Sequence, residues 1–105
     1  MADVYFEVTS LSNKKIRITR EYWNLIITVK HTPMKGREEL VKSALKEPDE
    51  IRKSNKDRDA FLYNKAWGKY FVVVVCKHLN GEGYITTTYI SDRIKAGEIT
   101  WKRHK

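Results

Sequence analysis

The chain has 105 residues, of which 41% are hydrophobic and 32% charged, and its 21 Lys and Arg against 13 Asp and Glu give a formal net charge of +8. This length and composition suit one folded domain with a single core, and they exclude a disordered chain. No apolar run approaches the roughly 20 residues that span a bilayer, and the first residues lack the pattern of a secretory signal. The positive charge favours an anionic partner, nucleic acid or an acidic protein, over a membrane.

The start of the chain predicts extended segments followed by a helix. Val4–Val8 is typical of a short edge strand or a loosely held arm, Ser10–Lys15 of a turn, and Ile16–Ile18 of a brief extended segment. Thr19 is a good N-cap, and Glu21 complements the helix dipole in the first turn. Apolar residues then recur at helical spacing: Tyr22, Leu25, Ile26 and Val29. We expect this first helix to end near Lys30.

A second helix is predicted directly after the first. Thr32 can cap it with Pro33 at its first position, where proline is well tolerated. Its expected apolar face consists of Leu40, Val41, Ala44 and Leu45. Pro48 should end it near Lys46.

The second half of the chain predicts strands. Short strands are expected at Glu50–Ser54 and Ile99–Trp101, a charged turn at Asn55–Asp59, and a helical turn at Ser91–Lys95. Between them, Ala60–Ile90 is rich in β-branched and aromatic residues bounded by glycines, which is typical of strands joined by tight turns. Its four consecutive valines favour a central strand covered on both faces. By the two-residue period, Thr87 and Tyr89 share one face of the last long strand with Ile85.

The predicted fold class is therefore α+β. Two N-terminal helices should pack on an antiparallel meander of about four strands, all in one domain over residues 1–105.

Motifs of common cofactor and metal sites are absent from the sequence. There is no glycine-rich dinucleotide or phosphate loop, and three dispersed histidines with one cysteine do not have the spacing of zinc ligands. Cys76 cannot form an intrachain disulfide, and its strand context predicts a small buried side chain. We expect no cofactor, no metal and a reducing, cytoplasmic environment.

The remaining polar residues suit metal-free RNA cleavage. That reaction needs a base for the attacking 2′-hydroxyl, an acid for the leaving oxygen, and cations or hydroxyls around the phosphate. His31 titrates near neutrality, and we predict that its ring lies beside Thr87 and Tyr89. Lys65 would add an ammonium if its strand face coincides with theirs. These four residues are the catalytic candidates.

Three further residues are candidates for binding the substrate. Arg52 and Arg58 can bind flanking phosphates in bidentate geometry. Tyr63 shares one strand face with Lys65 by the two-residue period.

A series of short motifs, in matching order, resembles the phage-associated barnase/EndoU/colicin/RelE-like nuclease families. The resemblance covers Ile16 to Trp101, through Ile16–Ile26, Lys30–Pro33, Ala44–Asp49, Arg52–Ser54, Leu62–Tyr63, Val73–Val75, Ile85–Tyr89, Ser91–Arg93 and Gly97–Trp101. It implies helices packed on an antiparallel sheet and a metal-independent endoribonuclease. Many such proteins are toxins, which implies an acidic antitoxin or immunity protein as partner. The implied site residues are His31, Arg52, Tyr63, Thr87 and Tyr89, and Lys65 occupies a position that is often basic.

Two other functions fit the same composition. A non-catalytic module could bind RNA or DNA through its charge and through stacking on Trp67. Alternatively, a basic interaction domain could bind an acidic protein. Cleavage products distinguish the nuclease from both.

Overall fold

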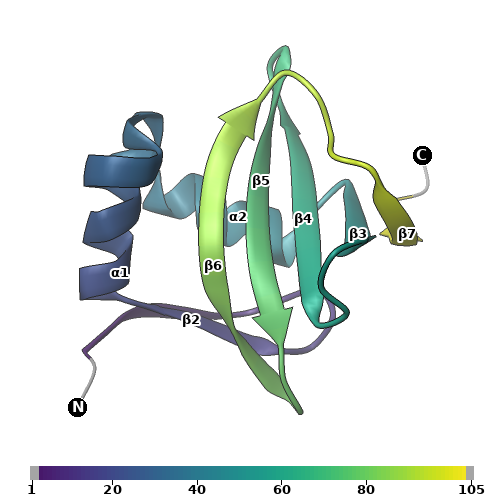
Figure 1. Ribbon diagram of the computed structural model, residues 1–105, viewed down its shortest axis with the longest axis horizontal. Helices are drawn as coiled ribbons and strands as arrows, with labels where there is room; N and C mark the ends of the chain where they lie inside the picture. The colour runs from purple at the N-terminus through teal and green to yellow at the C-terminus, as the bar shows by residue number, and fades with distance from the viewer. Residues whose placement is uncertain (1–2, 104–105) are drawn as a thin grey trace.

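The computed structural model describes residues 3–103 as one mixed seven-stranded sheet with short helices (Figure 1). The strands are β1 (Val4–Thr9), β2 (Lys15–Thr19), β3 (Glu50–Ser54), β4 (Ala60–Trp67), β5 (Tyr70–His78), β6 (Glu82–Ser91) and β7 (Gly97–Lys102). The helical segments are α1 (Arg20–Leu25), the π-helical η1 (Ile26–Lys30), the 3₁₀-helical η2 (Thr32–Met34) and α2 (Glu38–Lys46). Within these residues no helix is both long and apolar enough to cross a membrane.

The strand order β1-β2-β6-β5-β4-β3-β7 overturns the expected four-strand meander beneath two helices. The edge strand expected at Val4–Val8 is confirmed as β1, which lies at one edge of the sheet and is not a loose arm. The segment expected at Ile16–Ile18 is not isolated but belongs to β2, which forms an antiparallel hairpin with β1. This hairpin joins the sheet through a parallel pairing of Lys15–Arg17 with Glu82–Tyr84. At the other end, β7 returns to pair with β3. These pairings connect segments that are distant in sequence, and local patterns do not encode them.

The helical predictions are partly confirmed. Thr19 caps α1, since its hydroxyl accepts from the Tyr22 N–H at 3.1 Å, and helical structure continues to Lys30 as expected. The second helix does not begin at Pro33, because Gly36 adopts φ +78° and separates η2 from α2. Its end at Lys46 is confirmed. The helical turn predicted at Ser91–Lys95 is instead an irregular loop.

The core lies between the sheet and the helices. Trp23, Ile26, Met34, Val41 and Leu45 are buried from the helical side, and they pack with Tyr63, Val72, Val74, Cys76 and Ile85 from the sheet. Figure 1 shows α2 behind β4, β5 and β6, with no helix in front of these strands. The burial predicted for Cys76 is confirmed. We call the opposite surface of β3–β6 the helix-free face.

A β-bulge in β6 decides which side chains reach the helix-free face. Cys76 is opposite Ile85 and Val75 is opposite Thr87, so Thr86 is an extra residue in the ladder. The bulge reverses the alternation at that point. Ile85 therefore enters the core. The two-residue period had predicted that it shares a face with Thr87 and Tyr89, and this prediction is wrong.

Gly83 permits the close approach of β2, β5 and β6. A Cβ atom at this position would lie 2.3 Å from the Lys77 carbonyl oxygen and 2.9 Å from Ile16 Cδ1. We expect Gly83→Ala to lower the free energy of unfolding by about 1–3 kcal/mol, because backbone must shift to relieve the overlap. Urea unfolding measures this, with Glu98→Ala on the exposed strand β7 as a control. Equal midpoints for Gly83→Ala and the parent would contradict the tight packing.

Candidate functional site

Two rows of register partners cross the helix-free face. Because residues directly opposite in antiparallel strands point to the same side, each row presents its side chains together. One row consists of Tyr89, Val73, Asn64 and Glu50, and the next of Thr87, Val75, Leu62 and Arg52. Val73 in the first row, and Val75 and Leu62 in the second, thus separate the polar residues of β6 from the polar residues nearer β3.

At the β6 end of these rows, three residues from separate segments meet. His31 follows η1, where its N–H donates to the Ile26 carbonyl at 2.6 Å. Its ring centroid lies 5.3 Å from that of Tyr89, and Lys95 Nζ lies 5.7 Å from the Tyr89 ring centroid. The predicted proximity of His31 and Tyr89 is confirmed.

The pKa values in this group favour a neutral imidazole beside a protonated phenol. Burial, followed by the charges of Lys30 and Lys95, lowers the pKa of His31 from its ordinary value of 6.5. Burial raises the pKa of Tyr89 above 10.0. At neutral pH the site therefore offers a proton acceptor next to a hydroxyl donor.

Three buried polar atoms have no hydrogen-bond partner anywhere in residues 3–103. They are Asn64 Oδ1, Thr87 Oγ1 and Tyr89 Oη, and all three residues belong to the rows on the helix-free face. A buried polar atom without a partner costs about 1–3 kcal/mol, and most such atoms in folded proteins are satisfied. Their concentration on one face makes this face the candidate site.

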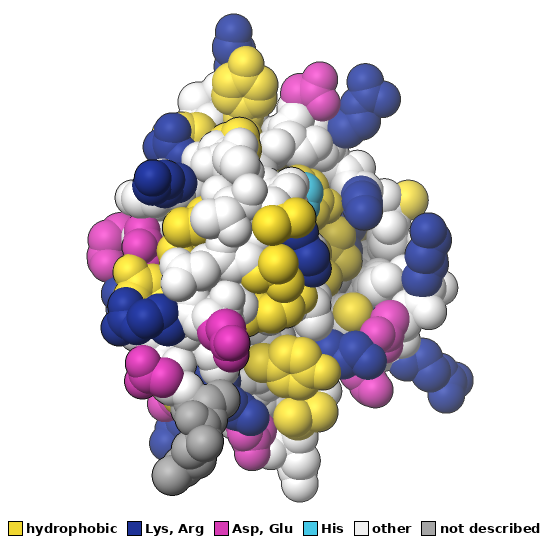
Figure 2. Space-filling view, turned by 60° about the vertical axis from the view of Figure 1, so that its left-hand side comes forward, with side chains coloured by type: hydrophobic (Ala, Val, Ile, Leu, Met, Phe, Trp, Pro, Cys, Tyr) yellow, Lys and Arg dark blue, Asp and Glu magenta, His cyan; other side chains and the backbone are white. Residues whose placement is uncertain are grey.

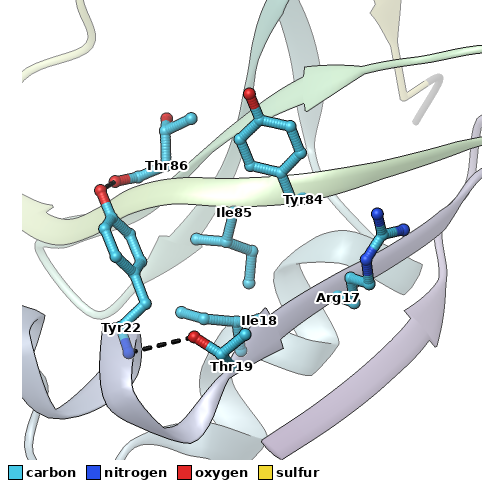
Figure 3. Close-up of a pocket in the computed structure, with 7 residues that line it drawn as sticks. All are labelled: Arg17, Ile18, Thr19, Tyr22, Tyr84, Ile85 and Thr86. Atoms are coloured by element: carbon cyan, nitrogen blue, oxygen red, sulfur yellow. Dashed lines mark hydrogen bonds between the residues drawn. The ribbon is translucent and has the colours of Figure 1, made fainter. Parts of the chain in front are cut away.

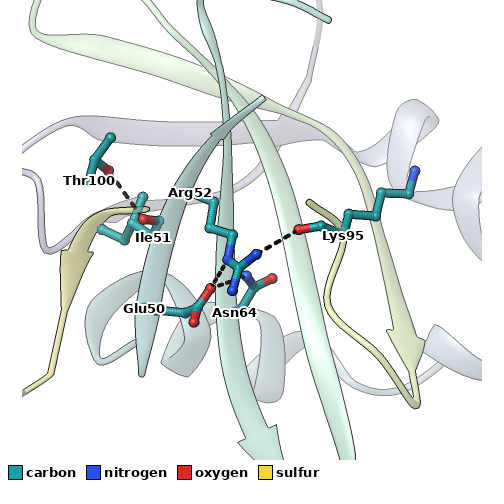
Figure 4. Close-up of polar contacts among 6 residues, drawn as sticks. All are labelled: Glu50, Ile51, Arg52, Asn64, Lys95 and Thr100. Carbon is teal, nitrogen blue, oxygen red and sulfur yellow. Dashed lines mark hydrogen bonds and ion pairs between the residues drawn. The ribbon is translucent and has the colours of Figure 1, made fainter. Parts of the chain in front are cut away.

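At the other end of the rows, Glu50 holds a small polar cluster (Figure 4). Arg52 forms an ion pair with the Glu50 carboxylate, and its Nη1 donates to the Lys95 carbonyl at 3.2 Å. Asn64 Nδ2 donates to the same carboxylate at 3.2 Å. Arg52 thus anchors the β6–β7 loop over the helix-free face, and this places Lys95 above Tyr89.

Two of the predicted site residues lie on the other side of the sheet. Tyr63 is opposite Val74 in the core; its hydroxyl donates to Ser10 Oγ at 3.1 Å and lies 2.9 Å from His78 Nε2. Lys65 Nζ donates to the Glu47 carbonyl at 2.8 Å. The strand faces of Lys65 and Thr87 therefore do not coincide, and the expected convergence of these two residues is wrong.

The remaining predicted residues occupy separate positions. Arg58 is exposed in the β3–β4 turn. Trp67 is half-buried, with the Arg37 guanidinium 4.5 Å from its ring centroid, so one face of the indole is already covered. Neither residue belongs to the rows on the helix-free face.

Three residues of the site were missed by the sequence reasoning: Glu50, Asn64 and Lys95. Lys95 lies in a loop that was predicted as helical. Asn64 carried a usable signal, because a polar amide within an apolar strand is a buried polar group that needs partners.

A second hollow of about 330 Å³ opens where β2 parts from β6 beside α1 (Figure 3). The side chains of Arg17, Tyr22 and Thr86 in this hollow already have partners in the protein. Arg17 forms an ion pair with Glu82, and the Tyr22 hydroxyl donates to the Thr86 carbonyl. This hollow therefore lacks the unpartnered atoms that mark the helix-free face.

Basic side chains surround the flank of the molecule that carries α1. Figure 2 shows Lys and Arg spread around this view and mixed with Asp and Glu, while hydrophobic side chains gather near its centre. On this face the Lys and Arg side chains are thus spread out and do not form one patch.

No family model, curated protein or solved structure matches the chain. Within residues 3–103, no group of three or more His, Cys, Asp or Glu side chains is placed to hold a metal ion.

Proposed function

We propose that this protein is an endoribonuclease that cleaves RNA by attack of a 2′-hydroxyl on the adjacent phosphate, without a metal ion. The observation that carries the proposal is the contact between the His31 and Tyr89 rings, 5.3 Å apart, on a face with two unpartnered buried hydroxyls. A proton acceptor, hydroxyl donors and cations are the groups that this transesterification requires.

In the proposed reaction, His31 takes the proton of the 2′-hydroxyl. The bond from O2′ to phosphorus then forms while the bond from phosphorus to O5′ breaks. The products are a 2′,3′-cyclic phosphate and a 5′-hydroxyl, and O5′ receives a proton from the protonated imidazole or from water. The lowered pKa of His31 supports its role as the base, because the neutral imidazole predominates at pH 7.

The surrounding groups stabilise the charge that develops on the phosphate. The Tyr89 and Thr87 hydroxyls would donate to its oxygens, which provides the partners that these buried atoms lack. Lys95, over the Tyr89 ring, supplies the ammonium that the sequence reasoning had assigned to Lys65. Arg52 acts indirectly, because it holds the loop that carries Lys95.

The charge of +8 and the resemblance to toxin nucleases support a cellular role as a toxin with an acidic antitoxin or immunity protein. Such a partner would bind the cationic surface and block access of RNA. Expression without the partner should then arrest growth, and His31→Ala should relieve the arrest. A basic domain that only binds an acidic protein would show neither effect.

The direct test is incubation of the purified protein with RNA in the presence of EDTA. We expect fragments that end in 2′,3′-cyclic phosphate, and much slower cleavage by His31→Ala and Thr87→Ala. If the parent makes no products, or if both variants cleave like the parent, the proposal fails. Salt-sensitive RNA binding without products would instead favour the non-catalytic binding module.

Lys95 and Lys65 distinguish the observed site from the one predicted by sequence. Lys95→Gln should lower kcat/KM for RNA by about 10–100-fold, because it removes a charge-assisted donor near the phosphate. Lys65→Gln and the exposed control Lys46→Gln should cleave at the parental rate. Cleavage kinetics measure this, and the reverse order of effects would place the reaction on the other side of the sheet.

A further inference from the structure

The hydroxyl of Tyr22 connects helix α1 to the bulge in strand β6 (Figure 3). It donates to the carbonyl of Thr86, the extra residue that interrupts the ladder between β5 and β6. A bulge leaves its extra residue without a place in the ladder, so Tyr22 supplies a partner from outside the sheet. The side chain of Thr86 is held as well, since its Oγ1 donates to the Val75 carbonyl at 3.1 Å. The bulge is therefore fixed from both α1 and β5.

Tyr22 is itself held in place at several points. Its N–H donates to Thr19 Oγ1 at 3.1 Å, at the N-cap of α1, and its ring packs against the core. Lys30 Nζ donates to the Tyr22 hydroxyl at 3.2 Å, which leaves the hydroxyl proton for the Thr86 carbonyl, because an ammonium only donates. Lys30 directly precedes His31 in the chain. Polar contacts thus run from the neighbour of the proposed base, through Tyr22, to the bulge.

The bulge decides where the two hydroxyls of the proposed site lie. It follows Ile85, which is buried in the core, and it precedes Thr87 and Tyr89, which point to the helix-free face. A regular ladder through Thr86 would shift the pairing by one residue, and such a shift turns every later side chain to the opposite face. The geometry of the bulge therefore sets the position of Thr87 and Tyr89 relative to His31.

We infer that Tyr22 is a positioning residue for the proposed reaction: its hydroxyl holds the bulge in place and thereby keeps Thr87 and Tyr89 aligned with His31. The hydroxyl is already engaged both as a donor and as an acceptor, so it acts through the bulge and not on the phosphate. This inference rests on the proposed function for its effect on cleavage, but the hold of the hydroxyl on the bulge can be tested apart from cleavage.

The first test compares the cleavage kinetics of Tyr22→Phe with those of the parent. This variant keeps the ring in the core and removes only the hydroxyl. We expect kcat to fall about 10–100-fold, because small displacements of reacting groups have effects of this size. KM should stay within about twofold, because no group that binds the substrate is lost. Parental kcat, or a rise in KM alone, would overturn the inference.

Tyr5→Phe is the matched control, because it also removes one tyrosine hydroxyl that joins two elements. The Tyr5 hydroxyl donates to Glu38 Oε2 at 2.6 Å, and this bond links β1 to α2, neither of which contains a residue of the proposed site. Tyr5→Phe should cleave at the parental rate per folded molecule. If both variants lose kcat equally, the loss reflects a general loosening of the fold, and the inference is overturned.

Hydrogen exchange measured by NMR tests the bulge without any cleavage. In Tyr22→Phe, the amides of β6 next to Thr86 should exchange about tenfold faster, since one hydrogen bond that keeps this part of the strand closed is lost. Amides in the middle of β4, such as that of Tyr63, should exchange as in the parent. Unchanged exchange next to Thr86 would show that the hydroxyl does not hold the bulge, and it would overturn the inference.

A double-mutant cycle with Thr87→Ala tests whether Tyr22 acts through the proposed site. If Tyr22 acts by placing Thr87, the losses of kcat in the two single variants should not multiply in the double variant. Full multiplication would show that Tyr22 acts elsewhere and would overturn the inference.

The same experiments separate the two proposals. If the parent does not cleave RNA but exchange next to Thr86 rises in Tyr22→Phe, the nuclease proposal fails and the hold of the hydroxyl on the bulge stands. If the parent cleaves RNA and Tyr22→Phe cleaves at the same rate, the nuclease proposal stands and the positioning role of Tyr22 fails.

Discussion

Replacing His31 with alanine should lower kcat/KM for RNA by about 10²–10⁴-fold, which is the usual contribution of a positioned general base. The geometry gives the reason: no other imidazole in residues 3–103 lies against Tyr89. His78 is on the core side of the sheet, where it stacks on Phe61 with ring centroids 4.1 Å apart. Single-turnover cleavage in EDTA measures the effect, and His31→Gln, which keeps a polar side chain but cannot act as a base, should match alanine. Parental rates in both variants would remove His31 from the mechanism.

The pH dependence of kcat/KM tests the same role of His31. A residue that only supports the structure would not set the pH at which kcat/KM rises. A base acts in its neutral form, so kcat/KM should rise with pH through the pKa of His31 and then reach a plateau. Burial and the charges of Lys30 and Lys95 lower that pKa, so the rise should lie below pH 6.5. Lys95→Gln removes one of these charges and should shift the rise to higher pH. If kcat/KM rises at the same pH in Lys95→Gln as in the parent, the Lys95 charge does not act on the group that titrates.

The parts of this fold that were predictable from sequence are those with local causes. The Thr19 cap, the end of the second helix before Pro48 and the strand at Glu50–Ser54 depend on neighbours in the chain, and the structure contains all three. The parallel pairing of β2 with β6 depends on segments that are far apart in sequence, so hydrophobic patterns could not reveal it.

The same distinction applies to the site. Alternation along a regular strand places Thr87 and Tyr89 on one face, and this holds because both follow the bulge. Which face of β4 joins them depends on the register between β4, β5 and β6, and one residue of register decides whether Lys65 or Asn64 is their neighbour. The period of the sequence gives both alternatives equal weight. Arg52 binds the carbonyl of Lys95 in the loop over the site, and no local pattern in the sequence predicts this contact.

Tyr63 is expected to act on stability and not on cleavage, although sequence reasoning placed it among the residues that bind RNA. Its side chain has no exposed surface. Its hydroxyl joins Ser10 Oγ at 3.1 Å and His78 Nε2 at 2.9 Å, and burial lowers the pKa of His78 to about 4, so this imidazole is neutral at pH 7. These contacts make Tyr63 a core residue that satisfies two other polar side chains on the side of the sheet away from Tyr89.

Two substitutions of Tyr63 separate the contribution of its hydroxyl from that of its ring. Tyr63→Phe should lower the free energy of unfolding by about 1–3 kcal/mol, because it leaves Ser10 and His78 without this partner. Tyr63→Ala should lower it by about 3–5 kcal/mol, because it also leaves a cavity in the core. Urea unfolding measures both, with Tyr70→Phe at an exposed position as the control. Cleavage per folded molecule should stay at the parental level in Tyr63→Phe, since the helix-free face is unchanged. If Tyr63→Phe unfolds like the parent but no longer cleaves RNA, Tyr63 takes part in the reaction and the substrate binds on the helical side of the sheet.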